Sequence, residues 1–201
     1  MSELERWEAR FSAPGYHFGT EPNAFLKSKA HLLKSGQQAL SIADGEGRNG
    51  VFLAERGLDV LAMDFSPTAL AKARALASER GVTIRTVQAD LDTWQWPVEA
   101  FDVVAAIFFQ FCAPPLRGRV FANIKRALKP GGLLLMEGYR PKQLQYKTGG
   151  PSEVENLYTR ELLEKSFADF SSVEIDEYDR EIHEGPGHGG MSALIDLVGR
   201  K

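Results

Sequence analysis

One short stretch decides the fold class of this chain: Ala39-Leu40-Ser41-Ile42-Ala43-Asp44-Gly45-Glu46-Gly47-Arg48-Asn49-Gly50. Residues 39–43 are small or apolar and are typical of a buried β-strand. The glycines that follow allow a sharp turn, and the apolar run 51–54 before Gly57 predicts a short helix. A strand, a glycine-rich turn and a helix in succession indicate the first βαβ unit of a parallel α/β sheet.

The same alternation continues along the chain. Helices are predicted after Glu21-Pro22, Ser66-Pro67 and Pro114-Pro115, and over 159–167. Further strands are predicted at 60–63, 83–87, 101–109, 133–136, 173–178 and 193–198. The last two strands have no helix between them, so we expect them to pair antiparallel. The expected fold is α/β: a doubly wound, mostly parallel, seven-stranded Rossmann-like sheet with an antiparallel C-terminal edge hairpin and helices on both faces.

Composition limits the class of protein. The 201 residues are 43% hydrophobic, and the formal net charge of −3 argues against a nucleic-acid-binding surface. The single cysteine, Cys112, excludes an internal disulfide and a cysteine-based zinc cluster and fits a reducing compartment. The longest apolar run, 103–109, is far shorter than the roughly 20 residues that span a bilayer, and residues 1–7 show no secretory signal. We therefore expect a cytoplasmic protein without nucleic-acid or membrane partners. Its oligomeric state stays open, and a monomer is compatible with the sequence.

Two strand ends carry the first candidate ligand contacts, because ligands of such sheets bind at the carboxyl ends of the strands. Gly45, Gly47 and Gly50 satisfy G-x-G-x-x-G, the dinucleotide fingerprint, although three glycines can also simply make a tight turn. Asp64 follows Gly47 by 17 residues, close to the roughly 20 expected for an acid that binds ribose hydroxyls. Taken alone, it is equally typical of a solvated strand end.

Two further strand ends offer ring contacts. Gln88-Ala89-Asp90-Leu91 follows the third strand, where a carboxylate can accept a hydrogen bond from an adenine amino group; the alternative is a polar turn. Phe108-Phe109-Gln110-Phe111 leaves the fourth strand, where aromatic side chains can wall a pocket for a planar ring. Core packing is the alternative for at least one of these phenylalanines.

With these residues the chain resembles the class I S-adenosylmethionine-dependent methyltransferases. The stretch 40–49 is similar to the family's first glycine motif, Asp64 to its ribose acid, and 88–90 to its adenine contact. The turn Leu128-Lys129-Pro130-Gly131-Gly132 is similar to the one before the family's fifth strand. The run 45–49 is also similar to the tellurite-resistance and thiopurine methyltransferase-like branch, which acts on small, soft nucleophiles. The upstream residues that share this likeness are Trp7, Tyr16, Gly19, Pro22 and Asn23.

The sequence departs from the family at two positions. Ser41 stands where the family usually has an acid, and Ala43 stands where it has its first glycine. In the family that acid orders the loop or meets the methionine amino group, and Asp44 and Glu46 are the candidates to replace it. Because alanine is small, we expect the change at Ala43 to be mild.

Charge favours one cofactor over the other. The pyrophosphate of NAD or NADP would lie against Asp44 and Glu46, and like charges in a poorly solvated site repel. S-adenosylmethionine carries two cations and no phosphate. The resemblance therefore implies S-adenosylmethionine, with contacts from Ala43, Asp44, Gly45, Gly47, Arg48, Asn49, Asp64, Phe65, Ala89, Asp90, Leu91 and Ile107.

We expect the acceptor side to come from the amino-terminal segment and from the insert at 139–147, although the insert's cations are also typical of solvated side chains. The substrate candidates are Trp7, Tyr16, Phe18, Phe109, Arg140 and Tyr146. The candidate proton acceptors are His183, His188 and Tyr146. The spacing of His183, Glu184 and His188 suits no standard zinc site, so no metal is expected. A hairpin loop with exposed histidines is the alternative.

These inferences give one expected organisation and three candidate functions. Residues 1–201 are expected to form one methyltransferase domain: an N-terminal cap segment (1–35), a cofactor-binding core (36–140), and a substrate-side insert with closing strands (141–201). The expected reaction is methyl transfer to a small soft nucleophile such as a thiol, selenium or tellurium species. The alternatives are an NAD(P)-dependent oxidoreductase and a non-catalytic cofactor-binding protein of the same fold.

Overall fold

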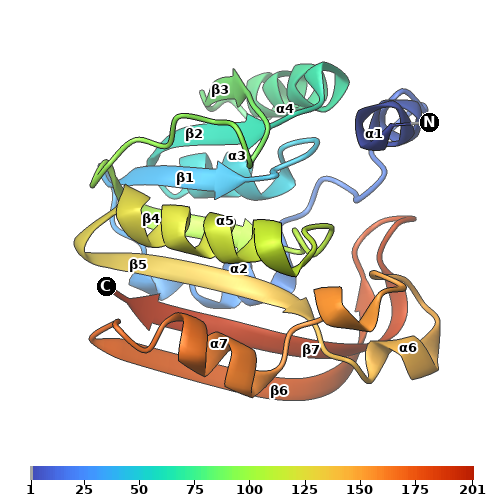
Figure 1. The fold of residues 1–201 in the computed structure, drawn as a ribbon. Helices are drawn as coiled ribbons and strands as arrows, with labels where there is room; N and C mark the ends of the chain where they lie inside the picture. The colour runs from blue at the N-terminus through green and yellow to red at the C-terminus, as the bar shows by residue number, and fades with distance from the viewer. Residues whose placement is uncertain (1) are drawn as a thin grey trace. The chain divides into compact units, whose positions relative to one another are not determined.

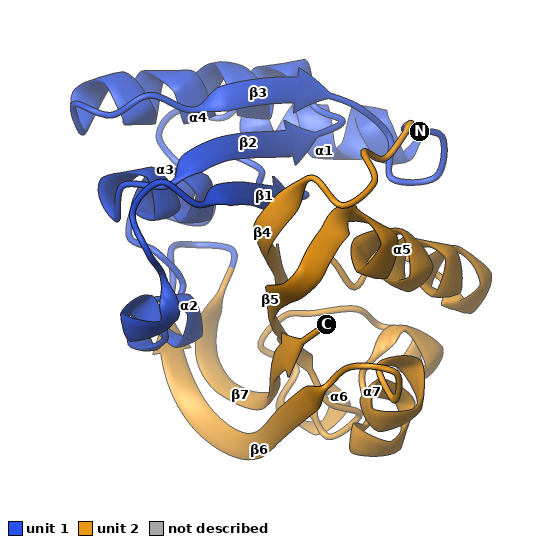
Figure 2. Ribbon diagram, turned by 90° about the vertical axis from the view of Figure 1, so that its left-hand side faces the viewer, with its two compact units in different colours: residues 1–94, 184–187 blue, residues 95–183, 188–201 orange. Residues whose placement is uncertain are grey.

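The computed structural model describes residues 2–201, which divide into two compact units (Figure 2). The first unit is Met1–Trp94 with Glu184–Gly187, and the second is Gln95–His183 with His188–Lys201. The first unit contains α1 (Glu3–Phe11), α2 (Ala24–Ser28), η1 (Ala30–Leu32), β1 (Gln38–Ile42), α3 (Arg48–Glu55), β2 (Asp59–Asp64), α4 (Pro67–Glu79) and β3 (Arg85–Gln88).

Strands β1, β2 and β3 of the first unit are parallel, so their carboxyl ends meet at one edge. Ile42 pairs with Met63, and Asp64 pairs with Gln88. Helices α3 and α4 pack on each other and against these strands (Figure 1). The start of α4 is fixed as the sequence predicts, because the Ser66 hydroxyl accepts the Ala69 N–H and proline follows it in the first turn.

The second unit contains the remaining strands. Here β4 pairs parallel with β5, and β7 pairs antiparallel with both β5 and β6. Its core is built from β-strand and helix side chains such as Val103, Leu134, Ile124 and Leu163. The elements are β4 (Phe101–Ile107), α5 (Pro114–Ala127), β5 (Leu128–Tyr139), α6 (Gln143–Tyr146), η2 (Val154–Asn156), α7 (Arg160–Ser166), β6 (Ser172–His183) and β7 (Gly189–Arg200).

The predicted fold class is confirmed. The sheet has seven strands in the order β3-β2-β1-β4-β5-β7-β6, mostly parallel and closed by the predicted antiparallel hairpin. The sequence did not predict α1 or α6, and it predicted β6 and β7 as shorter strands. It also predicted a turn at 128–132 and a strand at 133–136, whereas β5 runs from Leu128 to Tyr139. The division of the chain at 35 and 140 stays a prediction. No helix within residues 2–201 is long and apolar enough to cross a membrane.

Candidate functional site

The glycine loop, defined here as residues 43–50, joins β1 to α3. Gly45 and Gly47 have positive φ angles of 57° and 93°, which glycine adopts without strain. Gly47 also packs against α4, because an added Cβ would lie 2.6 Å from the Ala73 Cβ. Ala43 has a positive φ of 47° as well. Its small size therefore does not make the loss of glycine mild, because a left-handed conformation strains any residue with a Cβ.

Asp64 ties the glycine loop to the end of β2. Its Oδ2 accepts the Gly45 N–H at 2.9 Å, and its Oδ1 accepts the Ser66 N–H at 2.9 Å. The side chain is only 5% exposed, and burial raises its pKa despite these hydrogen bonds. Each carboxylate oxygen has two lone pairs, so both oxygens keep capacity for a further donor such as a ribose diol. The two strand-end motifs of the sequence are thus joined directly.

Asp44 orders the loop from beneath. Its Oδ1 accepts the Ser41 hydroxyl at 2.6 Å and the Gly50 N–H at 3.0 Å. Its Oδ2 is buried without a hydrogen-bond partner, and a Cβ added on Gly50 would lie 2.4 Å from it. Burial raises the pKa of Asp44 to about 7. Asp44 therefore takes the loop-ordering role that the sequence left open between Asp44 and Glu46.

Glu46 does something different: it binds the amino-terminal segment. Its Oε2 accepts the backbone N–H of His17 at 2.6 Å and of Phe18 at 3.4 Å. Its Oε1 lies 2.8 Å from the Lys72 ammonium, and its side chain is only 2% exposed. Lys72 also donates to the carbonyl oxygens of Ala13 at 2.8 Å and Gly15 at 2.6 Å.

A second buried ion pair stands at the start of α3. The Arg48 guanidinium donates to Glu184 Oε2 at 2.7 Å, and both side chains are about nine-tenths buried. Glu184 also accepts from the Asn23 side chain and from the Ala24 N–H at 3.0 Å. Asn49 Oδ1 accepts the Asn23 N–H at 3.0 Å. Arg48 and Asn49 thus bind other residues of the chain in this structure. Cofactor contact by either residue stays a prediction.

Aromatic side chains of the amino-terminal segment gather over the loop. Trp7 stacks on Phe11 at 5.5 Å, and Phe18 lies 6.2 Å from Trp7 and 6.5 Å from Phe11 between ring centroids. The Phe11 ring lies 3.6 Å from the position of a Cβ on Gly45. Trp7, Tyr16 and Phe18 lie in the same unit as the loop, and their contact with an acceptor stays a prediction. Phe11 was not singled out from the sequence as a site residue.

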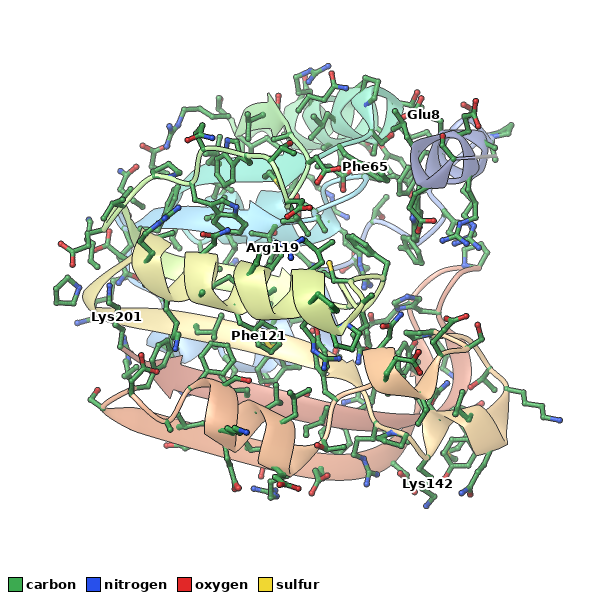
Figure 3. The ribbon with its side chains drawn as sticks, in the orientation of Figure 1. Glu8, Phe65, Arg119, Phe121, Lys142 and Lys201 are labelled. Atoms are coloured by element: carbon green, nitrogen blue, oxygen red, sulfur yellow. The ribbon has the colours of Figure 1, made fainter. Side chains whose placement is uncertain are left out.

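The helix α1 is held in place by Glu8, which Figure 3 labels together with Phe65. Its Oε1 accepts the Ser66 hydroxyl, and its Oε2 accepts the Thr68 hydroxyl at 2.6 Å. Burial alone would raise the pKa of Glu8, but these hydrogen bonds lower it. No sequence signal pointed to Glu8, since its partners lie 58 and 60 residues away.

The predicted adenine contact lies on the same edge of the sheet. The Ala89 N–H donates to the Asp64 carbonyl at 2.9 Å, and Gln88 donates to the Phe65 carbonyl at 3.2 Å. Asp90 is exposed and accepts the Asp92 N–H at 2.8 Å, whereas Leu91 is buried. Asp90 thus forms the polar turn that was the alternative, and its exposed carboxylate keeps lone pairs for a ligand.

Other predicted site residues belong to the second unit. Ile107 ends β4 and is 7% exposed. Phe109 is fully buried, 6.1 Å from Phe121 and 6.2 Å from Tyr158 between ring centroids. Phe109 therefore packs in the core, which was the alternative to a pocket wall for at least one of the phenylalanines. Phe108, which stacks on Tyr139 at 4.7 Å, is only half-buried.

The two loop histidines differ. His183 is exposed, as the loop interpretation predicts. His188 is buried, 4.4 Å from the Phe108 ring and 5.9 Å from the Tyr139 ring. The prediction of an exposed His188 is wrong, because the chain turns it into this aromatic cluster. Within residues 2–201 no group of three metal-ligating side chains gathers.

The insert residues converge on one acid. Arg140 and Lys142 both pair with Asp179 of β6, and Tyr146 donates to it at 2.9 Å. These hydrogen bonds lower the pKa of Asp179, and Figure 3 labels Lys142. Arg140 and Tyr146 therefore both bind Asp179 in this structure. Their contact with an acceptor stays a prediction.

A buried acidic pair in the second unit was not predicted. Tyr178 Oη lies 3.2 Å from Glu137 Oε1 and 2.9 Å from Asp196 Oδ2. Burial and the two carboxylates raise the pKa of Tyr178. Glu137 follows the apolar run of β5. An acid at the end of such a run was the only sequence signal for this buried cluster.

The polar groups of the first unit fit S-adenosylmethionine better than a dinucleotide. Asp64 has free acceptor capacity for a diol, and the positive φ angles of Gly45 and Gly47 keep the loop backbone free of side chains on a close approach. The buried carboxylate of Asp64 disfavours a pyrophosphate, whereas it favours a cationic ligand.

Comparison with known proteins agrees with this fit. Residues 39–132 match the model of a family described as a methyltransferase domain. A demethylmenaquinone methyltransferase of Thermus thermophilus is 35% identical over 112 residues, which are 55% of this chain and 50% of the relative. The chain spans half or less of the first curated relatives it matches, at 50%, 44% and 36% of their lengths.

Solved structures share the fold. One, from work on the conversion of a disulfide bond into a thioacetal group during echinomycin biosynthesis, has a TM-score of 0.72 at 21% identity, covering 99% of this chain and 91% of that chain. TehB from Haemophilus influenzae has a TM-score of 0.72 at 18% identity, covering 89% and 62%. Residues 39–132 therefore resemble a methyltransferase domain, and the two solved structures show a shared fold.

Proposed function

We propose that this chain transfers a methyl group from S-adenosylmethionine to a small-molecule acceptor. One observation carries the proposal: Asp64, buried at the end of β2, is hydrogen-bonded to Gly45 of the glycine loop. This joins a diol-binding carboxylate to a backbone that a ligand can approach closely. The matched methyltransferase domain supports the same cofactor.

The roles of the chain's residues follow from their chemistry. Asp64 would accept from the ribose hydroxyls, and Asp90 is the candidate for the adenine amino group. The cofactor supplies an electrophilic methyl group on a sulfonium. The protein's main contribution is then to hold the acceptor in line and exclude water, which is worth up to roughly 7–11 kcal/mol in well-oriented systems. The aromatic side chains of Trp7, Phe11 and Phe18 suit the exclusion of water.

For the acceptor we propose a soft nucleophile, such as a thiol, selenium or tellurium species. A thiol has a pKa of about 8.5 and is partly ionised near neutral pH, so it needs little help from a general base. The aromatic side chains of Trp7, Phe11 and Phe18 suit an apolar acceptor. A cytoplasmic setting and the absence of nucleic-acid partners stay predictions.

Calorimetric titration with S-adenosylhomocysteine tests the cofactor, because this demethylated product cannot turn over. We expect micromolar binding and none of NAD or NADP titrated in parallel. Binding of NAD or NADP alone would establish the oxidoreductase alternative. Turnover is then screened with thiols, selenite, tellurite, amines and hydroxylated rings; cofactor binding without turnover of any of them favours the non-catalytic alternative.

Substitution of Asp64 tests the residue that carries the proposal. Asp64→Ala should weaken S-adenosylhomocysteine binding by roughly 1–3 kcal/mol, since it removes charge-assisted contacts to the diol. Asp59→Ala is the matched control, because Asp59 is the exposed first residue of the same strand. Asp64→Asn is the second variant, since it keeps an acceptor for the loop. Unchanged affinity in a folded Asp64→Ala protein would refute the assignment.

A further inference from the structure

Two segments remote in sequence cover the glycine loop within the first unit. We call them the cover: residues 2–24 and the tip Glu184–Gly187. They are seated on each other, because the Gly187 N–H donates to the His17 carbonyl at 3.0 Å. A Cβ on Gly185 would lie 2.4 Å from the Gly19 nitrogen, so the two backbones are in direct contact. The cover is therefore one packed layer made from two segments that are remote in sequence.

Three carboxylates fasten the cover to the parts that would bind a cofactor. Glu8 of the cover binds Ser66 and Thr68 at the start of α4. Glu184 of the cover binds Arg48 of α3. Glu46 acts in the other sense, since it belongs to the loop and accepts N–H groups of the cover.

The seated cover leaves little of the loop accessible. Gly45 and Gly47 are buried, and Asp64 is 5% exposed. The Phe11 ring lies directly on Gly45, and the Asn49 side-chain oxygen accepts the Asn23 N–H. A molecule the size of a nucleoside can therefore lie against Gly45 only when the Phe11 ring moves off it.

We propose that the cover is a gate: it detaches to admit the cofactor to the glycine loop and then reseats, and the Glu46–Lys72 ion pair is its catch. This inference rests on the proposed function, since it concerns the same loop.

The position of Glu46 explains why it serves as the catch. Its described partners are the cover and Lys72, and Lys72 in turn binds two further carbonyl oxygens of the cover, at Ala13 and Gly15. The hydrogen bonds that shape the loop run instead through Asp64 and Asp44. Loss of the Glu46 carboxylate therefore removes the hydrogen bonds to His17 and Phe18 and the ion pair to Lys72, and it leaves the loop's own hydrogen bonds in place.

Stopped-flow binding of S-adenosylhomocysteine tests the gate. Trp7 lies in the cover, so tryptophan fluorescence reports its movement, and Trp7→Phe assigns the signal. In the unaltered protein the observed rate should level off at high ligand concentration, at the opening rate. Glu46→Gln should raise that plateau roughly tenfold, as expected for loss of a charge-assisted hydrogen bond.

Two variants keep the test decisive. Asp59→Asn removes an exposed ion pair with Arg85 in the same unit and should leave the plateau unchanged. Lys72→Met removes the other partner of the catch. It serves as the test variant if Glu46→Gln does not fold. Without ligand, trypsin should cut after Arg10 faster in the catch variants than in Asp59→Asn.

The outcomes separate the two ideas. A rate that rises linearly with ligand concentration, with no effect of Glu46→Gln, overturns the gate even though the titration still shows binding. An equal gain of plateau in Asp59→Asn also overturns it. Absence of S-adenosylhomocysteine binding in the equilibrium titration is instead a failure of the proposed function.

Discussion

At the scale of single residues, Asp44 shows how burial and hydrogen bonding compete. Two donors, Ser41 and Gly50, favour its ionised form, but both reach the same oxygen. The other oxygen is buried without a partner. Burial therefore wins, and the pKa of Asp44 rises from 3.8 to about 7. The neutral carboxyl is the form that the folded loop accommodates best.

This shift makes stability depend on pH. Because the pKa is higher in the folded than in the unfolded chain, the folded state binds the extra proton. The stabilisation from Asp44 is full below pH about 4 and is lost as the pH rises through about 7. Asp44→Asn mimics the neutral form, so the free energy of unfolding should fall less steeply between pH 5 and 8 than in the unaltered protein.

Urea unfolding across this pH range measures the difference between the two proteins. Asp64 and His17 keep their own shifts in both proteins and cancel in the comparison. Parallel curves for the two proteins would show that Asp44 is already ionised in the folded state.

Sequence reasoning could locate the glycine loop and Asp64, because local spacing carries that information. It could not assign Glu46, whose partner His17 lies 29 residues away, or Glu184, whose partner Arg48 lies 136 residues away. The prediction for His188 was wrong for a related reason. A histidine between glycines is typical of an exposed loop, and only tertiary packing buries this one.

At the scale of elements, α1 and α4 are joined by one side chain. Glu8 accepts from two hydroxyls, Ser66 and Thr68, at the amino-terminal end of α4, where a negative charge is also favourable. Glu8→Ala should lower the free energy of unfolding by about 1–2 kcal/mol, since it removes charge-assisted hydrogen bonds at a helix start. Denaturant titration measures this.

The control for that variant lies on the same helix. Glu3→Ala removes only an exposed pair with Arg6 and should change stability by less than about 0.5 kcal/mol. If Glu8→Ala costs no more than Glu3→Ala, the link between α1 and α4 does not contribute to stability.

The elements that the sequence predicted share a strong local signal. Helix α4 has a hydroxyl cap and a proline at its start, and β4 is apolar except for Asp102. Helix α1 was missed although Leu4, Trp7 and Phe11 stand at helical spacing and Ser2 with Glu5 forms a capping box. Strands β6 and β7 extend beyond their apolar runs, because their pairing continues through polar residues as far as His183 and Gly189.

At the scale of the whole molecule, a ligand that binds only the folded chain must stabilise it. With S-adenosylhomocysteine at 100 times its dissociation constant, the gain is about 2.7 kcal/mol. For a chain of this length that raises the unfolding midpoint by roughly 5–10 °C. NAD and NADP at the same concentration should leave the midpoint unchanged, since the buried carboxylate of Asp64 disfavours a pyrophosphate. A thermal scan with each ligand measures this, and Asp64→Ala should lose most of the rise. A rise with NAD that equals the rise with S-adenosylhomocysteine would mean that charge at the loop does not select the cofactor.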